Sequence, residues 1–91
     1  MKAVPPEESL ITYPSAFPIK VMGSHVPGFL EAMVAVARQF DPDLDPASVE
    51  QRFSKAGNYL SVTLTVTATS REQLDALYRT LSTHPMVKVV L

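Results

Sequence analysis

Apolar and polar residues alternate most regularly over residues 59–69. The apolar positions are Leu60, Val62, Leu64, Val66 and Ala68, and the polar positions between them are Ser61, Thr63, Thr65 and Thr67. A period of two places successive side chains on opposite faces of a strand. The pattern therefore predicts a long antiparallel strand with one buried face and one wet face. Shorter alternation over residues 17–22, 47–54 and 86–91 predicts three further strands.

Two other segments place apolar residues three and four positions apart, which is the spacing of one helix face. These segments cover residues 26–40 and 71–81. Pro27 suits the first turn of the first helix, where its missing amide would have no partner in any case. Ser70 and Gln73 form a capping box at the start of the second helix. In such a box the Ser70 hydroxyl accepts from the Gln73 amide, and the Gln73 side chain reaches back to the amide of Ser70.

The predicted elements follow one another in the order β-α-β-β-α-β. Right-handed crossovers turn this order into a four-stranded antiparallel sheet, with strand order 4-1-3-2 and both helices on one face. The predicted fold class is thus α+β, a ferredoxin-like sandwich. Residues 15–91 are expected to form this single domain, because a chain of 91 residues supports one core. Residues 1–14, which are rich in proline and carry adjacent glutamates at positions 7 and 8, are expected to form a flexible arm.

The composition narrows the classes of partner. Eight Lys and Arg stand against nine Asp and Glu, and no basic run occurs, so the cation surplus that nucleic-acid binding requires is missing. The chain has no cysteine, which excludes disulfides and thiolate metal sites and fits a cytoplasmic location. No secretory signal is evident, and no apolar run reaches the ~20 residues that span a bilayer. We therefore expect neither nucleic acid nor a membrane as partner, and no cofactor.

The topology gathers several polar loop residues at one end of the sheet. They come from the loop after the first strand, from the hairpin before residue 59 and from the loop before the last strand. The candidate ligand-binding residues are Gly23, Ser24, His25, Lys55, Gly57, Asn58 and His84. Ser24 and His25 lie just before a helix, where free amides and the helix dipole favour an anion. One interpretation is a pocket for a small carboxylate or phosphate, and the other is an ordinary polar rim.

The two histidines are the remaining candidates for chemistry. His25 and His84 lie at the ends of neighbouring strands, but two ligands without a thiolate or carboxylate make a poor metal site, so no metal is expected. No serine–histidine–acid set, phosphate-binding loop or dinucleotide fingerprint is present. We therefore expect no catalytic residue, and a minor hydrolase that uses His25 or His84 is kept as the weakest alternative.

The polar face of the predicted sheet is the candidate interaction surface. Its residues are Lys20, Met22, Tyr59, Ser61, Thr63, Thr65, Thr67, Lys88 and Val90. Met22 and Val90 make this face less polar than contact with water requires. One interpretation is a docking surface for another protein or for a second copy of the chain. The other is a wetted sheet built from good strand formers.

An ordered set of short motifs also resembles a known family. The motifs are Tyr13-Pro14, residues 17–23, Pro27, Ser54-Lys55, residues 57–59, residues 61–63 and residues 87–91. Together they resemble the YbeD-like family, small bacterial proteins of unknown biochemical function. The resemblance implies a ferredoxin-like fold similar to amino-acid-sensing ACT regulatory domains, and it brings no catalytic residue. Where the family runs Ser-Lys-Gly, Ala56 separates Lys55 from Gly57 here, so the hairpin is expected to be one residue longer.

These observations predict a non-catalytic regulatory or protein-interaction module. It would bind through the open sheet face or through a strand edge. The alternative is an ACT-like sensor of a small carboxylate or phosphate, which would bind at the loop of residues 23–25.

Overall fold

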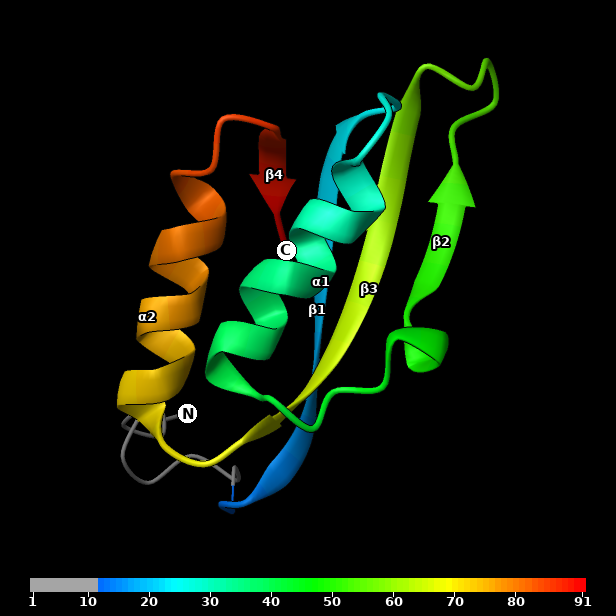
Figure 1. Ribbon diagram of the computed structural model, residues 1–91. Coiled ribbons are helices and arrows are strands. Elements are labelled where there is room, and N and C mark those ends of the chain that lie inside the picture. Colours follow the sequence, from blue (N-terminus) through cyan, green and yellow to red (C-terminus); the bar gives the residue numbers. More distant parts are fainter. Residues whose placement is uncertain (1–11) are drawn as a thin grey trace, which may run out of the picture.

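Four strands form one antiparallel sheet in the order β2-β3-β1-β4, in the computed structural model that describes residues 12–91 (Figure 1). Along the chain the elements are β1 (Ser15–Ser24), α1 (Phe29–Phe40), the short 3-10 helix η2 (Pro46–Ser48), β2 (Glu50–Phe53), β3 (Tyr59–Ala68), α2 (Arg71–Ser82) and β4 (Val87–Val90). Read from the other edge, this is the order 4-1-3-2, so the predicted ferredoxin-like α+β fold is confirmed.

Both helices lie on one face of this sheet and close the core against it (Figure 1). The buried residues come mainly from alternate positions of β1 and β3 and from one side of each helix. They are Ile19, Val21, Phe29, Met33, Val36, Ala37, Leu44, Leu60, Val62, Leu64, Val66, Ala68, Leu74, Leu77 and Leu81. The alternation that predicted the long strand therefore marks its helix-covered side.

The pairing of β1 with β3 is regular over all of their length, from Ser15 opposite Ala68 to Ser24 opposite Tyr59. Residues that face each other across an antiparallel pair project on the same side of the sheet. The odd positions of β1 and the even positions of β3 thus face the helices. The remaining positions form the other side, which we call the open face.

A β-bulge in β4 makes one part of the sequence interpretation wrong. Val90 pairs with Val21 and Val89 with Met22, but the next residue of β1, Gly23, pairs with Val87. Lys88 is therefore the extra residue of the bulge. Because a bulge shifts the alternation by one residue, Val87 and Val90 both pack against the core. The predicted place of Val90 on the open face is thus wrong, and Val89 takes it.

β1 extends two residues beyond its predicted range at each end, and two other predicted elements begin three residues later than expected. The first helix begins at Phe29 and not at residue 26, because Gly28 has a φ of 86°, which ends the turn that precedes the helix. The second strand begins at Glu50, because residues 46–48 form η2, where the Asp45 carboxylate accepts from the Ala47 amide at 2.9 Å.

Residues 1–11 of the predicted N-terminal arm, which covers residues 1–14, lie outside the described residues. At its end, Tyr13 packs against the core and β1 begins at Ser15. Within residues 12–91, neither α1 nor α2 is long and apolar enough to cross a membrane.

Candidate functional site

His25 fastens the β1–α1 loop to the β2–β3 hairpin. Its amide donates to the carbonyl oxygen of Asn58 at 2.9 Å, and its Nδ1 lies 2.9 Å from the carbonyl oxygen of Gly57. Since a carbonyl oxygen only accepts, Nδ1 carries the proton of this bond. The imidazole also lies against the ring of Phe53, with ring centroids 4.7 Å apart and planes at 54°. Topology alone predicted this approach of loop and hairpin.

The amides predicted to hold an anion are, however, already used. The His25 amide donates to Asn58, and the Val26 amide donates to the Ser24 carbonyl at 2.9 Å. The Phe29 amide at the start of α1 donates to the carbonyl of Val26 at 3.3 Å. An amide that is bonded to a carbonyl in this way offers no free donor to a ligand. These three amides are therefore not available to an anion, and the predicted pocket at this loop stays a prediction.

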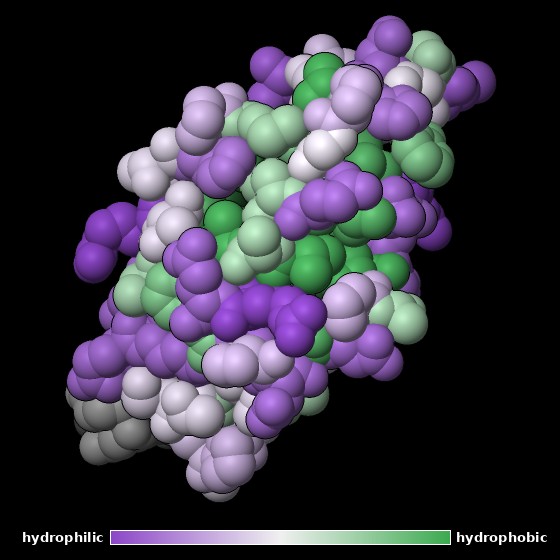
Figure 2. Space-filling view, viewed as in Figure 1, coloured by the Kyte–Doolittle hydropathy of each residue, from purple (hydrophilic) through white to green (hydrophobic). Residues whose placement is uncertain are grey.

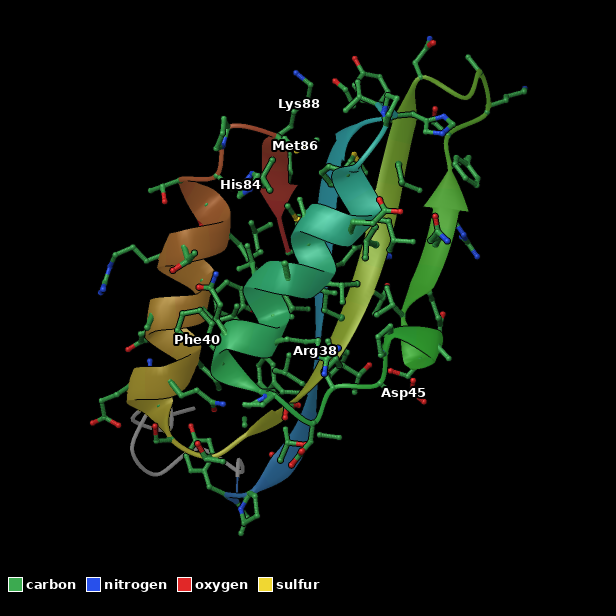
Figure 3. The ribbon with its side chains drawn as sticks, viewed as in Figure 1. Arg38, Phe40, Asp45, His84, Met86 and Lys88 are labelled. Carbon is green, nitrogen blue, oxygen red and sulfur yellow. The ribbon has the colours of Figure 1, made fainter. Side chains whose placement is uncertain are left out.

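The other predicted loop residues have separate roles. Gly23 is buried, and a Cβ built on it would lie 2.5 Å from Cε1 of Phe29, so it serves packing. Gly57 has a φ of 78° and allows the hairpin to turn, with Lys55 exposed beside it. His84 belongs to the α2–β4 connection, on the far side of β1 and β3 from the hairpin (Figures 1 and 3). The predicted residues thus share one end of the sheet without converging on one point.

The Nδ1 of His84 accepts from the Met86 amide at 3.1 Å, a contact within its own turn (Figure 3). In the part of the chain that the structure describes, no three histidine or carboxylate side chains come together as metal ligands.

The open face carries the predicted row of hydroxyls. Thr63 of β3 stands between Lys20 of β1 and Glu50 of β2, and Ser61 stands between Met22 and Arg52. Lys20, Glu50, Gln51, Arg52, Ser61 and Thr63 line a shallow hollow of about 190 Å³. Among residues 12–91, no helix covers this face (Figure 1).

An apolar stripe crosses the same face. It consists of Tyr59, Met22, Val89 and Leu91, which we call the apolar stripe from here on. Val89 lies opposite Met22, and the backbone of Leu91 pairs with Lys20 on the same edge. Tyr59, Val89 and Leu91 are 45%, 44% and 66% exposed. Val89 and Leu91 escaped prediction because they reach this face only through the bulge.

A second hollow adjoins the stripe near the hairpin. It measures about 220 Å³ and is lined mostly by apolar surface, from Met22, Arg52, Phe53, Ser54, Tyr59 and Ser61. The open face thus combines apolar side chains, hydroxyls and charges of both signs.

Comparison with known proteins places this chain among close relatives. The family described as "Protein of unknown function (DUF493)" matches residues 8–91. A UPF0250 protein of Leptothrix cholodnii is 74% identical over the full length of both chains. A UPF0250 protein of Bordetella pertussis is 65% identical, again over the full length of both.

A solved structure supports the fold independently of sequence. The solution structure of protein HP0495 from H. pylori matches with a TM-score of 0.75, over 100% of this chain and 96% of that one. The two sequences are 12% identical, so the likeness concerns the fold alone.

Proposed function

The chain belongs to the DUF493 family, and we propose that it acts as a non-catalytic module that binds a partner protein through the open sheet face. The membership confirms the predicted YbeD-like resemblance. The observation that carries the proposal is the apolar stripe, in which three large apolar side chains remain nearly half exposed or more on a face that no described helix covers. Apolar side chains grouped on a surface mark interaction sites more often than scattered ones do.

The surface fits an amphipathic helix whose apolar side chains are flanked by carboxylates. The open face presents two cations, Lys20 and Arg52, against one carboxylate, Glu50. A helix that lays apolar residues on Met22 and Val89 would bring its flanking carboxylates to Lys20 and Arg52. The other face of the sheet already binds α1 and α2 in this manner, through apolar residues at helical spacing.

Photo-crosslinking in living cells tests this proposal. A photoreactive residue at the exposed position Thr65 of the open face should form an adduct with a partner polypeptide. Val89→Glu should abolish that adduct, because it places a carboxylate in the apolar stripe. Val26→Glu is the matched control, since Val26 is 41% exposed beside the helices. It should leave the adduct unchanged.

The proposal fails if the adduct survives Val89→Glu, or if no polypeptide is cross-linked from the open face. Thermal unfolding of both variants checks that each remains folded, since a misfolded chain would also lose its partner.

A further inference from the structure

Among residues 12–91, the outer edge of β2 pairs with no other strand. The Ser54 amide donates to the Tyr59 carbonyl, so Ser54 and the alternate residues Arg52 and Glu50 turn their backbone groups toward β3. Gln51 and Phe53 therefore turn theirs outward. Natural sheets blunt such edges with bulges, proline, charged side chains or a very short strand. Glu50–Phe53 is short and carries two charges, but it contains no bulge, proline or lysine.

The opposite edge of the sheet is blunted. There β4 carries the bulge at Lys88. Beyond the end of β4, the exposed edge of β1 includes Pro18, which has no amide to donate. The contrast between the two edges singles out β2 as the strand able to accept another strand.

The sequence of β2 is complementary to itself in one antiparallel register. Two outward-facing residues must oppose each other for backbone bonds to form. With Gln51 opposite Gln51 of a second copy, Glu50 lies opposite Arg52 of that copy, and Arg52 lies opposite its Glu50. Both pairs lie on the open face, where cross-strand pairs of opposite charge are favourable. A register centred on Arg52 would oppose two arginines, and one centred on Phe53 would remove both pairs of Glu50 with Arg52.

The same register also matches apolar residues on the helix side of the sheet. It places Phe53 opposite Val49 of the second copy. Phe53 is 51% exposed, although its pairing with Leu60 turns it toward the helix side. Val49 lies half-buried on the same side. The second copy thus covers a phenyl ring that its own helices leave in water.

The surface of α1 carries a further hollow. It measures about 350 Å³ and lies between α1 and the start of η2, lined by Leu30, Glu31, Val34, Ala35, Arg38 and Pro46. Figure 2 shows apolar side chains gathered in the middle of this side of the molecule, around α1. The hollow thus lies on the helix side of the sheet, the side to which Phe53 also turns.

We propose that two copies of the chain associate through their β2 edges, antiparallel and with Gln51 on the two-fold axis. The two sheets then join into one sheet of eight strands, through about four backbone hydrogen bonds. This contact goes beyond the proposed function and does not depend on it, because it uses the strand edge and leaves the apolar stripe and Lys20 free, and only Arg52 takes part in both.

A charge exchange tests the interface and its register together. Sedimentation equilibrium of the full chain, from about 10 μM to about 1 mM, should show a monomer–dimer equilibrium. Glu50→Arg should weaken the dimer by about tenfold or more, because both ion pairs become arginine pairs. Arg52→Glu should do the same by pairing glutamates. An equimolar mixture of the two variants should dimerise again, since each arginine then meets a glutamate.

Glu72→Arg on α2 is the matched control, because it reverses an equally exposed charge away from β2, and it should leave the dimer constant unchanged. A second test uses the absence of cysteine from the chain. Gln51→Cys should oxidise to a linked dimer, because the two Cα atoms of a hydrogen-bonded antiparallel pair lie about 5.5 Å apart.

Three results would overturn the proposal. The first is a wild-type monomer at about 1 mM. The second is a dimer that both single charge variants leave intact. The third is a mixture of the two variants that stays monomeric while each variant is folded by circular dichroism.

Discussion

Gln73 offers the sharpest test of how α1, β3 and α2 are held together. Sequence rules and the structure predict opposite effects of one substitution on the free energy of unfolding. The residue occupies the third position of α2, where a glutamate completes a capping box and interacts favourably with the helix dipole. Sequence rules therefore predict that Gln73→Glu stabilises the protein. The structure predicts that it destabilises the protein.

The reason lies in three hydrogen bonds of the side-chain amide group of Gln73. Its oxygen accepts from the Thr69 amide at 2.6 Å, and its nitrogen donates to the carbonyls of Phe40 at 2.8 Å and Thr67 at 3.1 Å. Phe40 is the last residue of α1, so this side chain joins the ends of α1 and β3 to the start of α2 (Figure 3). A carboxylate keeps the first bond and loses both donated bonds.

The magnitude follows from these bonds. Each lost bond costs about 1 kcal/mol, and the carboxylate then faces two carbonyl oxygens without a proton between them. The helix dipole returns about 0.3–1 kcal/mol. The free energy of unfolding should thus fall by about 1–3 kcal/mol. Near pH 3, below the usual carboxyl pKa of about 4.3, the neutral acid can donate one bond again, so the difference from wild type should shrink.

Urea unfolding followed by circular dichroism, at neutral pH and near pH 3, measures both effects. Glu72→Gln is the control, because it removes an exposed charge from the same helix turn and should cost less than about 1 kcal/mol. A Gln73→Glu variant at least as stable as wild type at neutral pH would refute the role assigned to the Phe40 and Thr67 carbonyls.

Three further predictions concern single side chains. Gly23→Ala should lower the free energy of unfolding by about 1–3 kcal/mol, measured in urea, because its Cβ would meet the carbonyl oxygen of Met86 and the ring of Phe29. Asp41, 8% exposed, accepts from the Thr67 amide at 2.9 Å. Asp41→Ala should therefore cost about 1.5–3 kcal/mol in the same urea assay, and Asp41→Asn less. Burial raises the pKa of Tyr78 above its usual value of 10.0. As the pH rises through 10.0, Tyr78 ionises first in the unfolded chain, so stability falls, and Tyr78→Phe should flatten this fall above about pH 10.

The regular parts of the fold were predictable because one physical signal dominated them. Alternation over β3 and helical spacing in α1 and α2 each place apolar residues on the single face that the core can bury. Crossover handedness then leaves one sheet order. The capping bond from the Gln73 amide to the Ser70 hydroxyl, 3.0 Å, was predictable for the same reason, since it is local in sequence.

The parts that escaped prediction depend on contacts distant in sequence or on ambiguous patterns. Residues 86–91 are apolar at five of six positions, so their alternation fits either face, and only pairing with β1 reveals the bulge. The Gln73 side chain was predicted to bond the Ser70 amide, but it bonds the Thr69 amide and also reaches Phe40, 33 residues away. The amide of His25 was predicted free, and the hairpin carbonyl of Asn58 takes it.

The open face and the β2 edge are separable surfaces, and their combination makes a further demand on the molecule. In the proposed dimer, Glu50 pairs with Arg52 of the second copy and Arg52 pairs with its Glu50. Lys20 is then the cation of each open face that has no partner in this pairing. Val89→Glu should then abolish partner adducts while the dimer constant stays unchanged. Glu50→Arg should weaken the dimer while each monomer still forms the adduct, because the apolar stripe lies on β1, β3 and the C-terminal end of the chain. If both substitutions removed both activities, the two surfaces would be one, and partner binding would require the joined sheet.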